Sequence, residues 1–88
     1  MTQIHLGYFS AEELGNAIRA ERKALGRTQH WVANQCHIRV ATVSDLENGK
    51  NVTLFTVMTV LTALGKGLRI VDRHLALDQI VGMFNEED

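Results

Sequence analysis

The stretch RTQHWVANQCHIRVATVSDLENGK, residues 27–50, holds two short amphipathic segments with almost no linker between them. Thr28 is suited to cap the first segment, and Gly49 is suited to end the second. His37 and Ile38 form the turn that we predict between the two helices. Two helices joined this tightly cannot lie antiparallel and are expected to cross at a steep angle. The stretch therefore predicts a crossed pair of helices, one of which projects from the body of the protein.

Hydrophobic spacing predicts one further helix on each side of this pair. Upstream, Ser10 and Glu13 have the spacing of a capping box, and an apolar face continues to Leu25. Downstream, residues 52–64 are rich in β-branched side chains, which favour a strand. Their apolar positions nevertheless follow helical spacing, at Leu54, Val57, Met58, Leu61 and Leu64. The expected helices are therefore 11–25, one capped by Thr28, 40–48 and one within 52–64.

One short strand is predicted after the last of these helices. Gly67 precedes four residues with the pattern of a strand, Leu68, Arg69, Ile70 and Val71. A lone strand leaves its backbone groups without hydrogen-bond partners, and pairing with the same segment of a second copy would satisfy them. We therefore predict that residues 67–72 form the dimerisation strand of a symmetric homodimer.

Residues 75–88 are predicted to form a closing helix followed by an acidic tail. The apolar residues of this helix have helical spacing, at Leu77, Ile80, Val81 and Phe84. Two uses of the helix remain open, because it can dock on a protein partner or cap the dimer. Residues 1–88 as a whole are predicted to be a single, compact, all-α domain of four or five helices, with its core in residues 10–64.

Composition and length restrict the class of protein. With 88 residues, 45% hydrophobic and 22% charged, the chain is expected to fold as one soluble globular domain. Neither a signal-peptide pattern nor an apolar run long enough to span a bilayer is recognised, so no membrane contact is expected. The single cysteine, Cys36, cannot form an internal disulfide, and its expected role is that of a small core residue. A reducing, cytoplasmic location is therefore expected.

Charge is unevenly distributed, although the net charge is only -1. Residues 16–51 contain six lysine and arginine side chains against three carboxylates, a net charge of +3. Residues 1–15 and residues 52–88 each carry a net charge of -2. A basic middle between acidic ends favours an anionic partner for the crossed helices, and an ordinary solvated helix face is the alternative.

No catalytic or metal-binding arrangement is recognised. The sequence has neither a glycine-rich phosphate loop nor paired carboxylates beside a histidine, and so small a domain leaves little room for a pocket. His30, Cys36 and His37 lack the spacing of a metal site. We therefore expect a non-enzymatic protein that uses no metal and no cofactor.

The crossed helices carry residues that resemble the helix-turn-helix of the lambda-repressor/Cro-like (Xre) family. The matching positions are Gln29, Ala33, Val43, Ser44 and Glu47. Within that family, HIRVATVSDLENGKNVTL followed by LGKGLRIVDR is similar to the HipB-type antitoxins of toxin-antitoxin operons. The resemblance covers residues 10–73 and implies a lambda-repressor-like DNA-binding fold.

The resemblance also implies a function. A HipB-type protein would be a sequence-specific repressor that binds a palindromic operator in double-stranded DNA as a homodimer. It would repress its own operon, bind a HipA-type kinase toxin, and act in the cytoplasm at the nucleoid. The alternative is a stand-alone Xre- or Cro-like phage or metabolic repressor that has no toxin partner.

In this family the amino-terminal half of the third helix enters the major groove. The resemblance points to base contacts from Arg39, Val40, Ala41 and Ser44. Ordinary packing is the alternative for Val40 and Ala41, and a solvated charge is the alternative for Arg39. Phosphate contacts are expected from five residues near the helix ends: Thr28, Gln29, Thr42, Asn48 and Lys50.

Three further positions have expected structural roles. The family pattern pairs Glu47 with Arg22 of the first helix. Trp31 is expected to be a partly buried packing residue, and contact with a partner or with the DNA backbone is the alternative. At the turn, where this chain has His37, the family usually has glycine, because the residue there tends to adopt a left-handed conformation. Histidine adopts that conformation only at a cost, which leaves the detailed geometry of the turn open.

Overall fold

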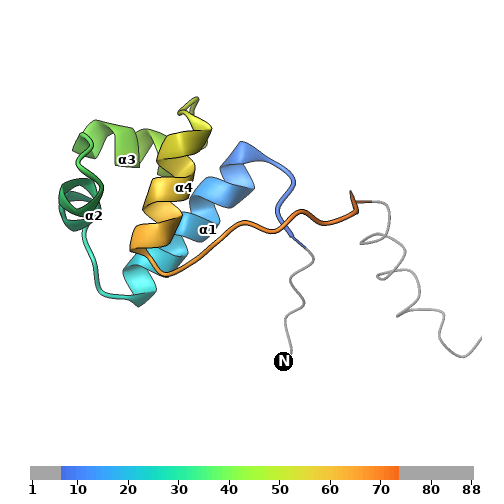
Figure 1. The fold of residues 1–88 in the computed structure, drawn as a ribbon, viewed down its shortest axis with the longest axis horizontal. Helices are drawn as coiled ribbons and strands as arrows, with labels where there is room; N and C mark the ends of the chain where they lie inside the picture. Colours follow the sequence, from blue (N-terminus) through green and yellow to red (C-terminus); the bar gives the residue numbers. More distant parts are fainter. Residues whose placement is uncertain (1–6, 74–88) are drawn as a thin grey trace, which may run out of the picture.

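The computed structural model describes residues 7–73. Four helices follow one another in this range (Figure 1), and their bounds are α1 (Ala11–Ala24), α2 (Gln29–Cys36), α3 (Val40–Glu47) and α4 (Leu54–Ala63). The all-α fold and the four helices predicted from hydrophobic spacing are confirmed. The predicted closing helix, with Leu77, Ile80, Val81 and Phe84, lies outside the described residues.

Side-chain caps fix the start of three helices. The hydroxyl oxygens of Ser10, Thr28 and Thr53 cap α1, α2 and α4, and each accepts the backbone N–H of the residue three positions later. The N-cap residue of α3 is Arg39, whose side chain makes no hydrogen bond of this kind within the described residues. The first amides of α3 are therefore open at the end of the helix that was predicted to read DNA.

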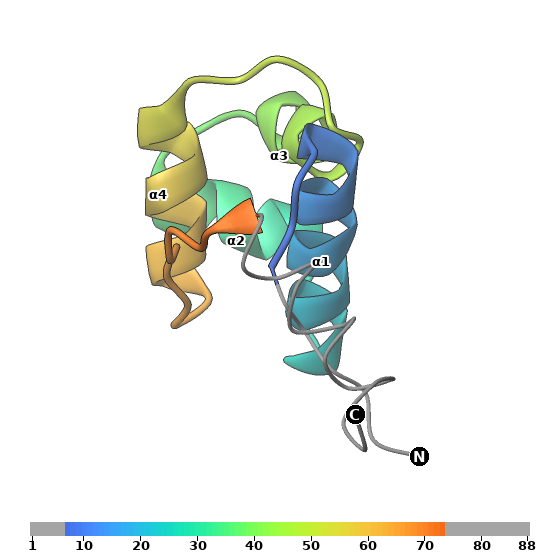
Figure 2. The same cartoon turned by 90° about the vertical axis from the view of Figure 1, so that its right-hand side faces the viewer.

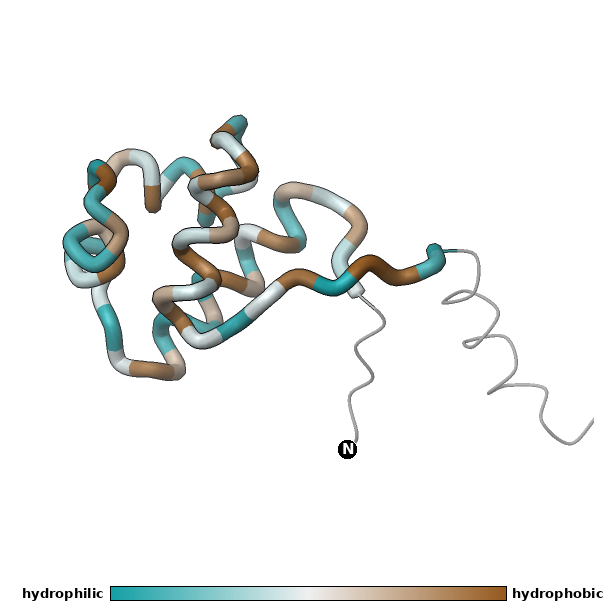
Figure 3. Tube along the Cα trace, in the orientation of Figure 1, coloured by the Kyte–Doolittle hydropathy of each residue, from teal (hydrophilic) through white to brown (hydrophobic). Residues whose placement is uncertain are grey.

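The core lies between all four helices. Cys36 is buried in it as expected, where its thiol donates to the carbonyl of Thr59 at 3.7 Å, and burial raises the pKa of this thiol. Figure 3 shows hydrophobic positions recurring at intervals along the helices. The buried apolar residues are Ile18, Val32, Ala33, Cys36, Val43, Leu46, Val57, Val60, Leu61 and Leu64.

Gly15 allows α1 to lie directly against the end of α3. A Cβ atom at this position would lie 2.5 Å from the carbonyl oxygen of Leu46 and 2.7 Å from that of Glu47. No side chain fits between two backbones at that distance, so glycine is required for this approach. The close contact brings the next turns of α1, with Arg19 and Arg22, over the end of α3.

The turn between α2 and α3 has the left-handed conformation expected at His37, with φ 56° and ψ 43°. The N–H of His37 donates to the carbonyl of Asn34, and the N–H of Ile38 donates to that of Ala33 at 3.0 Å. These two bonds define a Schellman motif, which satisfies the last carbonyls of α2. The usual turn is thus formed even though its central residue is not glycine.

The predicted strand, residues 68–71, is an extended segment without a strand partner within residues 7–73, where no strand is formed. Ile70 is fully exposed, and Leu68 and Val71 are partly exposed. The segment leaves the end of α4 and passes residues 7–9 (Figures 1 and 2), where Arg73 lies 4.9 Å from the ring of Phe9. A strand needs a second strand to pair with, and pairing across a dimer stays a prediction.

Candidate nucleic-acid interface

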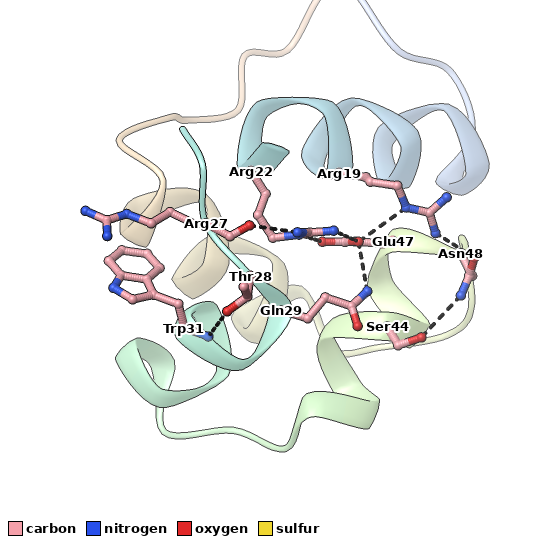
Figure 4. Close-up of polar contacts among 9 residues, drawn as sticks. All are labelled: Arg19, Arg22, Arg27, Thr28, Gln29, Trp31, Ser44, Glu47 and Asn48. Atoms are coloured by element: carbon pink, nitrogen blue, oxygen red, sulfur yellow. Dashed lines mark hydrogen bonds and ion pairs between the residues drawn. The ribbon is translucent and has the colours of Figure 1, made fainter. Parts of the chain in front are cut away.

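A buried ion pair joins α1 to α3. Glu47 is only 1% exposed, and Arg22 is 8% exposed. The guanidinium of Arg22 donates from Nε to Oε2 of Glu47 at 2.6 Å and from Nη2 to Oε1 at 3.0 Å (Figure 4). Two parallel bonds of this kind fix orientation as well as distance. The pair expected from the family pattern is confirmed.

Two more side chains converge on the same carboxylate. Gln29, the first residue of α2, donates from Nε2 to Oε1 of Glu47 at 3.0 Å, and Arg19 donates to the same oxygen at 3.3 Å. The second amino group of Arg22 donates to the carbonyl of Arg27 at 2.8 Å, in the connection between α1 and α2. The Glu47 network, formed by Arg19, Arg22, Gln29 and Glu47, therefore ties three helices together.

The network keeps Glu47 ionised. Burial by itself would raise the pKa of this carboxyl, but hydrogen bonds from Arg22, Gln29 and Arg19 outweigh burial and hold the pKa below its usual value. The hydrogen bond with Glu47 raises the pKa of Arg22, against the effect of burial. Both groups therefore carry their charges at neutral pH.

The residues predicted to read bases lie at and after the start of α3, with unequal exposure. Arg39 occupies the N-cap position and is exposed, as is Ala41. Ser44 is half-buried, and its hydroxyl accepts from the side-chain amide of Asn48 at 3.3 Å. Val40 is half-buried and packs against the core, so packing accounts for part of its role.

The residues predicted to contact phosphates lie at the ends of α2 and α3. The oxygen of Thr28 caps α2, and one N–H of the Gln29 amide is bound to Glu47. Asn48 accepts from Arg19 at 2.8 Å and is exposed. Thr42 is half-buried, and the exposed amine of Lys50 lies 3.9 Å from Asp45.

The contacts of two arginines near the predicted interface, Arg19 and Arg27, were not recognised from the sequence. Arg19 links Glu47 to Asn48, and the signal for it is its position one turn before Arg22 on α1. The guanidinium of Arg27 lies 4.4 Å from the centre of the Trp31 ring, and the signal for this contact is their separation by four residues. Trp31 itself is half-buried against the core, as expected.

Within the described part of the chain, no group of three or more histidine, cysteine, aspartate or glutamate side chains is arranged to hold a metal ion. In the same range no helix has the length and hydropathy needed to cross a bilayer.

The family of the chain follows from its match to a sequence model. The model of the helix-turn-helix family matches residues 18–71, which run from the middle of α1 to the extended segment after α4. No curated protein matches the sequence. The chain therefore belongs to the Xre-like helix-turn-helix family of DNA-binding regulators.

Solved structures of HipB are similar to this chain over most of its length, which confirms the HipB-type resemblance. HipB in a HipA-HipB-O2-O3 complex has a TM-score of 0.73 and 31% identity, covering 78% of this chain and 99% of that chain. HipB in a HipB-O4 20mer complex gives the same values. The clp gene regulator ClgR from C. glutamicum has a TM-score of 0.63 and 31% identity, covering 69% of this chain and 80% of that chain.

Replacing Glu47 with glutamine is expected to destabilise the fold strongly. The variant leaves the guanidinium of Arg22 buried without its counter-charge, and breaking a buried pair in this way costs about 3–5 kcal/mol. The matched control is Glu21→Gln, because Glu21 pairs with Lys66 at 3.2 Å on the exposed side of α1, where a pair is worth less than about 1 kcal/mol. Urea unfolding of both variants measures the difference, and equal losses would contradict a central role for Glu47.

The same comparison has an expected pH dependence. Because folding lowers the pKa of Glu47, its charge contributes stability above the ordinary glutamate pKa. That contribution is lost as the pH falls through the lowered value. Glu47→Gln has no such group to titrate, so the gap in unfolding free energy between it and the unaltered protein should narrow in acid.

Proposed function

We propose that this chain is a dimeric repressor that reads a palindromic DNA operator with α3, and that it is the HipB-like antitoxin of a toxin-antitoxin operon. The observation that carries DNA reading is the start of α3, which is exposed, open at its first amides, and held in place by the Glu47 network. In this proposal it acts in the cytoplasm, at the nucleoid, and is not an enzyme.

The base contacts use the chemistry of the exposed start of α3. The guanidinium of Arg39 has the two donors needed for O6 and N7 of a guanine, and Ser44 can donate or accept at a base edge. Ala41, with a smaller share from Val40, can contact thymine methyl groups. Because the two copies of α3 in a dimer would each read one half-site, the centres of the two half-sites should lie about one turn of the DNA helix, ~34 Å, apart.

The phosphate contacts surround this reading helix. The free amides at the start of α2, beside Thr28 and Gln29, favour an anion. Thr42, Asn48 and Lys50 supply further donors around α3, whereas Asp45 would repel phosphate. Asn48 is well suited to the task because Arg19 and Ser44 already hold its side chain.

The dimer is proposed to form through the extended segment. The apolar side chains of Leu68, Ile70 and Val71 are exposed in the single chain. These side chains line a hollow together with α1, α4 and residues 7–9. A second copy of the segment would pair with residues 67–72 as a neighbouring strand and cover this apolar surface.

A toxin partner is proposed from the HipB relatives, one of which was solved in a complex with HipA. The predicted closing helix, with Leu77, Ile80, Val81 and Phe84, is a candidate docking element for a HipA-type kinase, and capping of the dimer is its other proposed role. The similarity to ClgR favours a second function, that of a stand-alone Xre- or Cro-like phage or metabolic repressor.

Alanine at Arg39 is expected to weaken binding to the operator, selected with the unaltered protein from a random-sequence duplex pool. Losing a bidentate contact should cost about 1–3 kcal/mol and relax the preference at one base position. Ser44→Ala should have a smaller effect, and Lys66→Ala, after the end of α4 and paired with Glu21, serves as the charge-matched control. Unchanged affinity in the double variant of Arg39 and Ser44, with helix content intact, would rule out α3 as the reading helix.

Aspartate at Ile70 is expected to prevent dimerisation, because it would place a charge in the apolar strand interface. Sedimentation velocity should show a monomer for this variant and a dimer for the unaltered protein. Phe55→Asp is the control, since Phe55 is 81% exposed at the other end of α4. A dimer that persists in Ile70→Asp would place the interface elsewhere.

Purification of the native complex from its source cells tests the toxin partner, with mass spectrometry of the co-purifying proteins. A HipA-like kinase at equal stoichiometry is the expected result. Recovery of the homodimer alone would contradict the antitoxin role and leave the stand-alone repressor. Deleting residues 75–88 then separates the two roles of the closing helix, through loss of the kinase or loss of the dimer.

A further inference from the structure

Arg27 and Trp31 form a stacked pair beside the start of α2 (Figure 4). The guanidinium carbon of Arg27 lies 4.4 Å from the centre of the indole ring, which is within the range of a cation–π interaction. Trp31 is half-buried and packs against the core, whereas Arg27 is exposed. A fixed ring therefore holds a guanidinium at the protein surface.

The backbone of Arg27 is also held. Its carbonyl accepts from Nη1 of Arg22 at 2.8 Å, and its N–H donates to the carbonyl of Arg22 at 3.1 Å. The next residue, Thr28, caps α2. The backbone of Arg27 is therefore held by hydrogen bonds, and its guanidinium is held by the Trp31 ring. Because both are restrained before binding, the side chain loses little conformational entropy when it binds a ligand.

Apart from its contact with the Trp31 ring, the charge of Arg27 is not paired with a carboxylate within the described residues. Among residues 7–73, the ion pairs of Arg19, Arg22, Lys50 and Lys66 each involve a carboxylate, and none involves Arg27. A stacked guanidinium keeps its N–H edge available, and that edge matches the oxygens of a phosphate.

We propose that Arg27, positioned by Trp31, is a further DNA-phosphate contact on the α2 side of the reading helix. This inference rests on the proposed DNA-binding function and adds a residue to it. Arg27 lies before α2 and outside α3, so it contacts the DNA backbone and contributes equally to all sequences. Trp31 is a positioning residue in this arrangement, since it acts on the DNA through Arg27.

The first test compares Arg27→Gln with the unaltered protein on two duplexes, the selected operator and one of arbitrary mixed sequence, over a range of salt concentrations. The variant should lose affinity by the same factor on both, on the order of tenfold. The slope of log affinity against log salt should become shallower by about 1, because one phosphate contact is lost. Lys66→Gln, which removes one positive charge from the segment after α4, should leave the slope unchanged.

The second test asks whether Trp31 acts through Arg27. Trp31→Leu keeps an apolar side chain against the core and removes the aromatic face, so it should weaken DNA binding when Arg27 is present. In the Arg27→Gln background the same change should have no further effect. Trp31→Phe restores an aromatic face and should recover binding, and thermal unfolding of each variant separates these effects from loss of fold.

Trp31 also provides a direct readout, because it is the only tryptophan in the chain. Addition of DNA should change its emission in the unaltered protein and leave it unchanged in Arg27→Gln. Equal affinity and equal salt slope for Arg27→Gln and the unaltered protein would overturn the proposal. It would also be overturned if Trp31→Leu lowered the DNA affinity as much in the Arg27→Gln background as in the unaltered protein. If Arg39→Ala still weakens operator binding in that case, the proposed DNA-binding function survives.

Discussion

The buried carboxylate of Glu47 determines how the first three helices are arranged. It comes from the last turn of α3 and accepts hydrogen bonds from two arginines of α1 and from Gln29 at the start of α2. A charge at 1% exposure is tolerated only with partners in good geometry, so the helices that supply them have little freedom to move. Gly15 permits this arrangement, because any side chain there would push α1 away from α3.

This polar arrangement has a direct bearing on DNA recognition. Gln29 and Asn48 are both predicted phosphate contacts. The side chain of Gln29 is bound to Glu47, and that of Asn48 is bound to Arg19 and Ser44. Packing of the apolar core sets the distances between the helices, whereas these directional hydrogen bonds set their orientation relative to one another. In the proposed DNA complex, a helix α3 held in this way would need little rearrangement on binding, which lowers the entropic cost of association.

Much of this fold could be predicted from the sequence, since helical spacing and capping residues are local signals. The periodicity of residues 54–64 correctly outweighed their β-branched composition, and the pairing of Glu47 with Arg22 followed from the family pattern. The spacing of Arg19 from Arg22 places both on one side of α1, but the bonds that Arg19 and Gln29 make to Glu47 depend on side-chain directions set by the packing of three helices. The segment at residues 68–71 shows another limit, since a strand depends on a partner, and residues 7–73 of one chain do not supply one.

The open start of α3 has a consequence for local stability. Arg39 provides no side-chain acceptor, so the first turn depends on backbone bonds such as those from Thr42 and Val43 to the carbonyl of Arg39. A helix terminus with few bonds opens more readily than the core, and its amide hydrogens exchange sooner with solvent. The amino-terminal end of α3 is thus the least protected part of that helix. A hydrogen-bond acceptor on a bound molecule would supply the capping bond that the side chain of Arg39 does not make.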